Sequence, residues 1–149
     1  MERVRSTTIA SMALRRNAKV ELLRTVPLFA RCSKGELAAI AAEADELDVS
    51  AGRALTVEGQ SGREFVVLVS GSAEVSRNGK QINTLGDGDF LGEIALLTGV
   101  PRTATVTTTT PCHLLILTDR AFRRVTHAMP SVGEKVLQAL AERLPPDAV

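Results

Sequence analysis

The feature that most constrains the fold is the texture of residues 46–118, where short β-branched and apolar runs alternate with glycine-containing turns. The turns recur roughly every ten residues, a spacing typical of an antiparallel β-sandwich or barrel. Eight strands are predicted, at Leu47–Val49, Ala54–Val57, Glu64–Ser70, Ala73–Arg77, Gln81–Leu85, Asp89–Leu91, Ala104–Thr109 and Cys112–Thr118.

Two local patterns sharpen this prediction. Asn78-Gly79 separates two of the strands, and this dipeptide favours the tight two-residue turn of a β-hairpin. The run Glu64–Ser70 is apolar at both alternating sets of positions. It is therefore expected to lie in the middle of a sheet with both of its faces covered.

Helical patterns precede the strands. The stretch Ile9–Thr25 carries an imperfect apolar stripe of helical period, and Pro27 ends it because proline lacks an N–H donor. Ser33 stands three residues before Glu36, which is the spacing of a capping box. A second helix is therefore predicted over the Ala-rich run Leu37–Ala44.

Two further helices are predicted after the last strand. Asp119 is expected to cap a helix over Arg120–Met129, and a second helix is expected from Ser131 towards Pro145-Pro146. The predicted fold class is α+β, mainly β: an eight-stranded antiparallel β-roll, or jelly roll, flanked by N-terminal helices and two C-terminal helices.

The length of 149 residues and the apolar content of 44% suit a single domain. We divide it into an N-terminal helical lead (1–45), a β-roll (46–118) and C-terminal helices (119–149). No window approaches ~20 uninterrupted apolar residues, and the N-terminus lacks the apolar region of a secretory signal, so a cytoplasmic location is expected. Cys32 and Cys112 are far apart and are expected to be free thiols.

The charge is nearly balanced but unevenly distributed. Residues 1–20 hold five Lys or Arg and one Glu, a net +4, which leaves 13 basic and 16 acidic residues, a net −3, elsewhere. The overall charge of +1 argues against a nucleic-acid or membrane-surface protein. The basic lead is compatible with partner docking, with a transit peptide or with a solvated start to a helix.

The stretch Gly92–Val106 carries a chemical signal. Gly92 permits positive φ or a close approach, and Ile94–Thr98 is long enough for one helical turn whose free N–H groups point back towards it. Arg102 brings a planar guanidinium to the same stretch, and Thr103 adds a hydroxyl donor. A helix N-terminus combined with an arginine suits a phosphate group.

Glu93 is unexpected beside an anion, because a second anion is repelled unless it meets another part of the ligand. A carboxylate accepts hydrogen bonds from hydroxyl groups, so a sugar phosphate satisfies Glu93 and Arg102 together. In a 3′,5′-cyclic nucleotide the 2′-hydroxyl is the one free ribose donor. The alternative is a surface Glu–Arg pair on a tight turn, which contributes only about 0–1 kcal/mol.

The string Phe90–Val106, FLGEIALLTGVPRTATV, resembles the phosphate-binding cassette of the cyclic nucleotide-binding domain family. This family includes regulatory subunits of cyclic-AMP-dependent protein kinase, cyclic-nucleotide-regulated channels and catabolite activator proteins. The resemblance extends from Val26 to the closing helices and implies an eight-stranded β-roll flanked by helices. One departure is Leu91, where an aromatic residue commonly precedes the Gly-Glu pair.

The resemblance also implies roles for individual residues. It assigns the cyclic phosphate to Arg102, Thr103 and the backbone N–H groups of Ile94 and Ala95, and the ribose to Glu93 beside Gly92. In family members the final helix covers the base. The candidates for base capping are Val136, Leu137, Leu140 and Leu144, with Lys135 and Arg143 as stacking cations.

The expected function is that of a cyclic nucleotide-binding sensor whose ligand moves the C-terminal helices, and not that of an enzyme. The resemblance favours cAMP as ligand, with cGMP as the alternative because Thr103 occurs with either base. No cofactor and no metal are expected. A protein partner is expected at the N-terminal or C-terminal helices, and nucleic acid and membrane are not.

The sequence fits three other functions less well. A transcription factor of the catabolite-activator type needs a helix-turn-helix, and no segment is left for one before Val149 unless the chain is a fragment of a larger cAMP-responsive protein. A metal-dependent enzyme of the cupin kind needs clustered ligands, whereas His113 and His127 lie on different elements and are each expected to be structural or solvated. A degenerate module that only binds a protein partner is disfavoured by the presence of Glu93 and Arg102.

Overall fold

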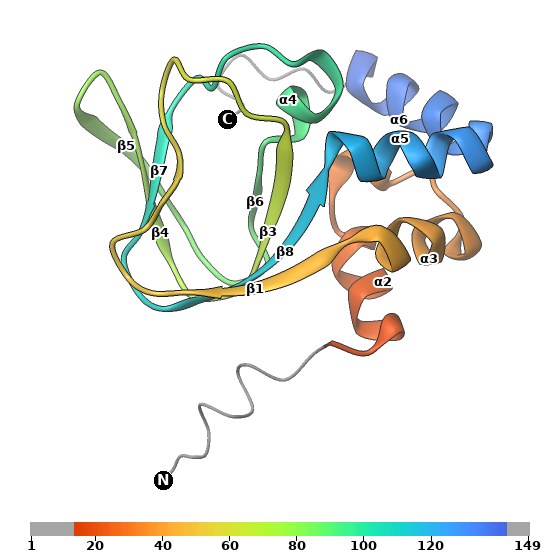
Figure 1. The fold of residues 1–149 in the computed structure, drawn as a ribbon, viewed down its shortest axis with the longest axis horizontal. Coiled ribbons are helices and arrows are strands. Elements are labelled where there is room, and N and C mark those ends of the chain that lie inside the picture. Colours follow the sequence, from red (N-terminus) through yellow and green to blue (C-terminus); the bar gives the residue numbers. More distant parts are fainter. Residues whose placement is uncertain (1–13, 143–149) are drawn as a thin grey trace, which may run out of the picture.

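In a computed structural model, which describes residues 14–142, the β-strands form a roll of two four-stranded antiparallel sheets (Figure 1). The first sheet has the strand order β1-β8-β3-β6 and the second the order β2-β7-β4-β5. The eight-stranded antiparallel roll predicted from the sequence is thus confirmed. The strands are β1 (Asp45–Val49), β2 (Ala54–Thr56), β3 (Glu64–Ser70), β4 (Ala73–Arg77), β5 (Lys80–Leu85), β6 (Phe90–Leu91), β7 (Thr105–Thr108) and β8 (Cys112–Thr118).

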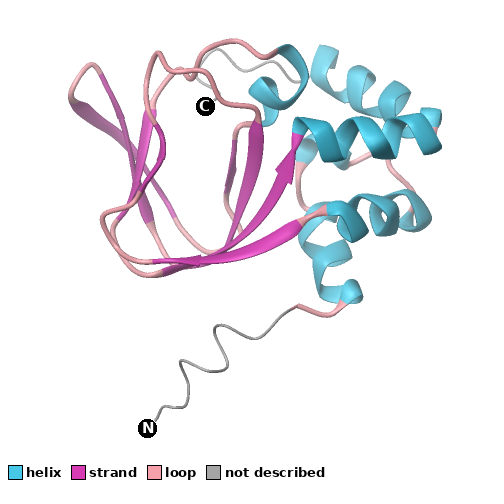
Figure 2. Cartoon of the chain, in the orientation of Figure 1, coloured by secondary structure: helices cyan, strands magenta, loops and turns pink. Residues whose placement is uncertain are grey.

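The helices gather at one side of the roll, next to the first sheet (Figure 2). The short helix α4, which lies between β6 and β7 in the sequence, contacts α5, and its Leu96 belongs to the core that the helices share with the first sheet. None of the described helices combines the length and the apolar character needed to cross a membrane. The helical segments are α2 (Arg16–Arg24), the 3₁₀ turn η2 (Pro27–Phe29), α3 (Lys34–Glu43), α4 (Glu93–Thr98), α5 (Asp119–Ala128) and α6 (Pro130–Glu142).

Strand β3 is buried on both faces, as predicted for a central strand. Phe65 and Val67 belong to the core between the first sheet and the helices, where the ring of Phe65 meets that of Phe29 edge-on at 5.6 Å. Val66 and Leu68 belong to a second core inside the roll. The first sheet therefore separates two apolar cores.

The predicted hairpin and capping box are both present. Asn78 and Gly79 have φ values of 54° and 79°, the left-handed conformation that a type I′ turn needs at both positions. The Ser33 side chain accepts from the Glu36 N–H at 3.2 Å, and the Glu36 carboxylate accepts from the Ser33 N–H at 2.7 Å. Helix α3 begins directly after Ser33.

Several predicted helix boundaries were wrong: α3 begins at Lys34 and α6 at Pro130, where Leu37 and Ser131 were predicted. Thr118, not Asp119, caps α5: its hydroxyl accepts from the Ala121 N–H at 3.1 Å, while Asp119 is already the first helical residue. Within the described part of the first predicted helix, Arg15 is extended and the helix begins at Arg16. Residues 9–13 of that prediction lie outside the described residues.

Candidate functional site

Arg102 lies in the loop between α4 and β7 and is only 6% exposed. Its Nη2 donates to the Glu64 carbonyl oxygen at 2.8 Å, and the Glu64 carboxylate is 3.7 Å away. Its Nη1 is buried and has no hydrogen-bond partner among the described residues. A buried donor without a partner costs about 1–3 kcal/mol, so this nitrogen is placed as if for a group from outside the chain.

Two glycines make room for the guanidinium. A Cβ at Gly62 would lie 2.7 Å from Arg102 Nε, and a Cβ at Gly92 would lie 2.7 Å from Arg102 Nη1 and 2.4 Å from the Glu64 carbonyl oxygen. Gly92 also has a φ of 87°, in the left-handed region that favours glycine. Residues with side chains at these two positions would displace Arg102.

The predicted one-turn helix is confirmed as α4, which follows Gly92 directly. The Leu96 N–H donates to the Gly92 carbonyl oxygen at 3.0 Å and closes the first turn. The amides at the start of a helix have no partner within the helix, and those of Ile94 and Ala95 belong to this turn. Because Gly92 touches Arg102, the start of α4 and the guanidinium lie side by side, with Glu93 half-buried at the first helical position.

The loop that carries Arg102 is held by its backbone. The Arg102 N–H donates to the Gln60 carbonyl oxygen at 2.9 Å, and the Gly59 N–H donates to the Arg102 carbonyl oxygen at 2.8 Å. These two bonds tie Arg102 to the turn between β2 and β3. The segment that supplies Gly62 and Glu64 is therefore fixed next to the segment that supplies Arg102.

The electrostatic state of Arg102 follows from this burial. Desolvation lowers the pKa of Arg102, and the nearby Glu64 carboxylate opposes that change. An arginine pKa starts so high that the group stays charged near neutrality. The site therefore holds a dehydrated cation that one half-exposed carboxylate compensates only in part.

Arg63 connects the end of α4 to α5. A Cβ at Gly99 would meet Arg63 Nη2 at 2.7 Å, so the guanidinium covers Gly99. Arg63 Nη1 also lies 3.6 Å from the Asp119 carboxylate, and the Asp119 N–H donates to the Arg63 carbonyl oxygen at 3.0 Å. Sequence reasoning missed Gly62, Arg63 and Glu64, and the glycine just before a buried strand was the one available signal.

The residues predicted to cap the base lie on or beyond α6, which packs mainly against α5 and η2. Val136 is fully buried in the helical core, and Leu140 packs against that core. Leu137 is 61% exposed. Leu144 and Arg143 lie outside the described residues.

A buried carboxylate ties α6 to α3. Glu36 accepts hydrogen bonds from Ser131 Oγ at 2.5 Å and from Lys135 Nζ at 2.6 Å, in addition to the Ser33 N–H. The hydrogen bond from Lys135, followed by those from Ser131 and Ser33, lowers the pKa of Glu36 to about 2. Lys135, which the resemblance offered as a stacking cation, is thus paired with Glu36 here.

Comparisons with known proteins identify the family. The model of the cyclic nucleotide-binding domain family matches residues 46–128. A cAMP-dependent protein kinase regulatory subunit from Mycosarcoma maydis is 34% identical over 141 residues, which is 88% of this chain and 27% of the relative. The chain thus corresponds to about a quarter of that protein's length.

Two solved structures resemble the chain closely. The N-terminal domain of a transcriptional regulator from Streptomyces coelicolor A3(2) superposes with a TM-score of 0.76 at 30% identity, covering 83% of this chain and 91% of that one. The regulatory domain of Toxoplasma gondii PKA, crystallised with cAMP, has a TM-score of 0.68 at 29% identity. The match covers 74% of this chain and 44% of that one. The fold, the site and these matches together show that the chain belongs to the cyclic nucleotide-binding domain family.

Proposed function

We propose that this chain binds a 3′,5′-cyclic nucleotide, cAMP in preference to cGMP, between α4 and Arg102, and that it is a regulatory module and not an enzyme. The observation that carries the proposal is the buried Nη1 of Arg102, which has no hydrogen-bond partner within residues 14–142. A cyclic phosphate brings one negative charge and two free oxygens. It can accept from Nη1 and from the amides of Ile94 and Ala95 at the same time.

The ribose is assigned to Glu93. Gly92 and Glu93 are adjacent, so a phosphate seated at Arg102 leaves the neighbouring sugar close to the start of α4. The Glu93 carboxylate can accept from the 2′-hydroxyl, and Thr103, which is exposed, offers a hydroxyl on the other side of the phosphate. A linear nucleotide carries a second phosphate charge and lacks the ring geometry.

The base is assigned to α6. Leu137 is the exposed apolar residue of that helix, and a base without cover leaves its aromatic faces in water. In the present arrangement Glu36 and Arg31 hold α6 on the helical side, through Lys135 and Glu142. Ligand-driven movement of α6, with Leu137 and Leu144 as capping residues, gives the module an output for a protein partner.

The proposal extends to the regulatory role and the organisation of the chain. The relatives named above are a kinase regulatory subunit and a transcriptional regulator, so the output belongs to a partner or to a further part of a longer protein. We assign residues 46–118 to the roll, 1–45 to the lead and 119–149 to the moving helices of one domain. We assign no cofactor and no metal to it.

Calorimetric titration with cAMP, cGMP and 5′-AMP tests the proposal. Arg102→Ala is expected to weaken cAMP binding at least about 30-fold, because truncating one partner of a buried charge pair costs about 2–5 kcal/mol. Arg124→Ala, which removes an exposed arginine paired with Glu43, is the matched control and should bind normally. Undiminished binding by Arg102→Ala would rule out the site.

A thermodynamic cycle that combines one protein variant with one ligand analogue tests the ribose assignment. The 2′-deoxy analogue of cAMP should bind the wild type about tenfold more weakly than cAMP, as expected for one hydrogen bond to a charged group. Glu93→Gln should lose most of this discrimination. If the variant still distinguishes the two ligands as well as the wild type does, another group reads the 2′-hydroxyl.

A further inference from the structure

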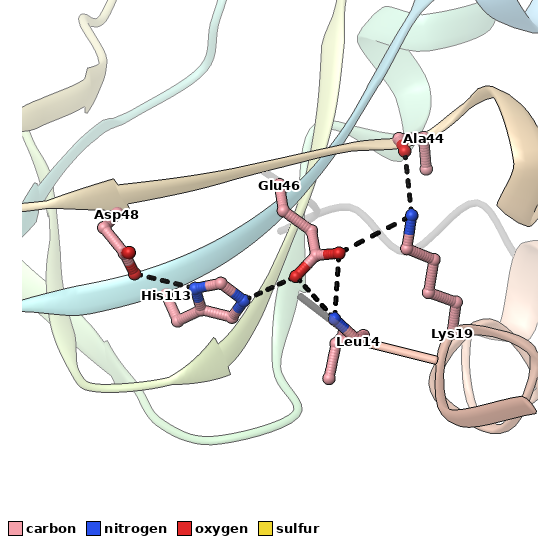
Figure 3. A network of polar contacts seen from close by, with 6 residues as sticks. All are labelled: Leu14, Lys19, Ala44, Glu46, Asp48 and His113. Atoms are coloured by element: carbon pink, nitrogen blue, oxygen red, sulfur yellow. Dashed lines mark hydrogen bonds and ion pairs between the residues drawn. The ribbon is translucent and has the colours of Figure 1, made fainter. Parts of the chain in front are cut away.

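His113 on β8 is buried, at 5% exposure, between two carboxylates (Figure 3). Its Nδ1 lies 2.7 Å from Asp48 Oδ1, and its Nε2 lies 2.8 Å from Glu46 Oε1. Both carboxylates come from β1, where Asp48 is the direct register partner of His113. The sequence left His113 as either structural or solvated; its burial fits the first, and its two charged neighbours were not foreseen.

The proton count of this arrangement follows from its geometry. A carboxylate can only accept, so each ring nitrogen must donate, and only the imidazolium form has two N–H donors. The three groups therefore bond one another and leave no ring nitrogen for a metal ion. Consistently, no group of three His, Cys, Asp or Glu residues suited to a metal is found in the described residues.

Glu46 also contacts two residues of the N-terminal lead. The Leu14 N–H donates to both oxygens of Glu46 at 3.0 Å each, just before α2 begins (Figure 3). Lys19 on α2 lies 3.6 Å from Glu46 Oε2 and donates to the Ala44 carbonyl oxygen at 3.3 Å. His113, Glu46 and Leu14 thus form a continuous chain of contacts from the roll to the segment just before α2.

The groups that surround His113 differ in charge from one element to the next. Glu46 and Asp48 face it from β1, Lys19 reaches Glu46 from α2, and the partner of His113 on β3 is the uncharged Ser70. Burial is the largest influence on the pKa of His113 and lowers it, but the hydrogen bonds and charges of Asp48 and Glu46 together raise it above the ordinary 6.5. The pKa of Glu46 is lowered: burial opposes this, and the bonds from Leu14 and His113 outweigh it.

We propose that His113 is a pH-sensitive anchor: its charged imidazolium holds the chain at Leu14 against the β-roll, and loss of its proton loosens that attachment. The neutral ring donates to only one carboxylate and no longer balances either charge. Asp48 is half-exposed and can turn to water, whereas the Glu46 side chain is 14% exposed and, among the described residues, keeps only Lys19 as a cation. A buried carboxylate with less compensation is costly, and the simplest relief is for the Glu46 side chain to turn towards water and release the Leu14 N–H.

The two pKa shifts determine how the attachment at Leu14 depends on pH. A group whose pKa is raised by folding stabilises fully below its unfolded value of 6.5, and this contribution is lost as the pH rises through the folded pKa. Glu46, whose pKa is lowered, keeps its contribution until the pH falls through its own folded pKa. The lead is therefore anchored between these two limits and loosens on the alkaline side.

The experiment is an NMR titration of the full chain that follows the His113 ring and the Leu14 amide together. The His113 ring should titrate above 6.5. Across the same midpoint, the protection factor of the Leu14 amide, corrected for intrinsic exchange, should fall about tenfold, as for one lost hydrogen bond to a charged group. If His113 titrates and Leu14 protection does not change, Asp48 alone absorbs the loss and the anchor is not pH-sensitive.

Asp48→Asn is the sharper variant, because this half-exposed position tolerates substitution and does not touch Leu14. It removes one charge from beside His113, so the His113 midpoint and the midpoint of Leu14 protection should both move to lower pH by the same amount. His127→Gln, at the exposed histidine, should move neither. A shift of the His113 midpoint alone would overturn the proposal.

Discussion

Arg102 and His113 are both cationic and buried to the same degree, at 6% and 5% exposure, but their surroundings differ. His113 has a carboxylate at each nitrogen, at 2.7 and 2.8 Å. Arg102 has one carbonyl oxygen, a carboxylate at 3.7 Å and a nitrogen with no partner in the part of the chain that the structure describes. The pKa of His113 is raised and that of Arg102 is lowered. The fold completes the pairing of His113, and we propose that an anion from outside the chain completes that of Arg102.

The largest expected effect is a difference in stability between variants of these two residues in the ligand-free protein. His113→Leu leaves Glu46 and Asp48 without their cation and should lower the free energy of unfolding by about 3 kcal/mol at mildly acidic pH. Arg102→Met removes a charge that is not fully paired and should stay within about 1 kcal/mol of the wild type. Urea unfolding measures both. Equal losses would mean that Arg102 is as well satisfied as His113.

The second prediction concerns the room left for Arg102. Gly92→Ala should lower the free energy of unfolding by about 2–3 kcal/mol, because it combines positive φ with a contact to the Glu64 carbonyl oxygen, and it should displace Arg102 and abolish nucleotide binding. Gly88→Ala is the matched control. Gly88 has a φ of 84°, but a Cβ added there would have no atom within 4 Å. The variant should therefore lose only about 1 kcal/mol of stability and bind nucleotide normally. Similar behaviour of the two variants would argue against a tight approach at Gly92.

Glu36 extends the comparison to a fully paired anion. Glu36→Gln should lower stability at neutral pH by about 1–3 kcal/mol, since it weakens three hydrogen bonds at once. The Glu36 pKa is lowered from 4.5 to about 2, so its contribution is present above pH 4.5 and is lost as the pH falls through about 2. The two unfolding curves should therefore converge in acid, whereas the exposed Glu134→Gln should match the wild type throughout. A difference that persists at low pH would contradict the pairing.

The smallest effect is expected at Glu64. Its half-exposed carboxylate competes with an incoming phosphate for Arg102, so Glu64→Gln should tighten cAMP binding by about two- to fivefold at low salt, an effect of at most ~1 kcal/mol. Salt should reduce the gain. Glu74→Gln, an exposed change on β4, controls for net charge. Weaker binding by Glu64→Gln would show that the carboxylate positions Arg102 and does not compete for it.

The strands were predictable because alternation and glycine turns are local signals. The predicted Glu64–Ser70, Ala73–Arg77 and Cys112–Thr118 agree with the observed strands at both ends. The cap of α5 was missed because Thr118 and Asp119 are adjacent and both can cap. The choice depends on Thr118 being extended, with φ of −80° and ψ of 159°, as the last residue of β8.

The predicted site was incomplete because half of its contacts come from distant parts of the chain. The cassette motif identifies Arg102, but Glu64 lies 38 residues away, and only the antiparallel packing of the roll brings its carbonyl to the guanidinium. The same applies to His113 and Glu46, 67 residues apart, whose contact depends on the register between β1 and β8. Sequence patterns predict which strands exist but not which side chains meet across them.

The sheet that separates the two cores also limits how the chain can be divided. Phe65, Val67, Leu115 and Leu117 face the helices, so a roll cut away from them would present this apolar surface to water. Such a surface promotes aggregation, and we therefore expect fragments covering only residues 45–118 to be insoluble even though they retain every strand. We therefore expect the roll and the helices that share its outer core to fold together as one unit.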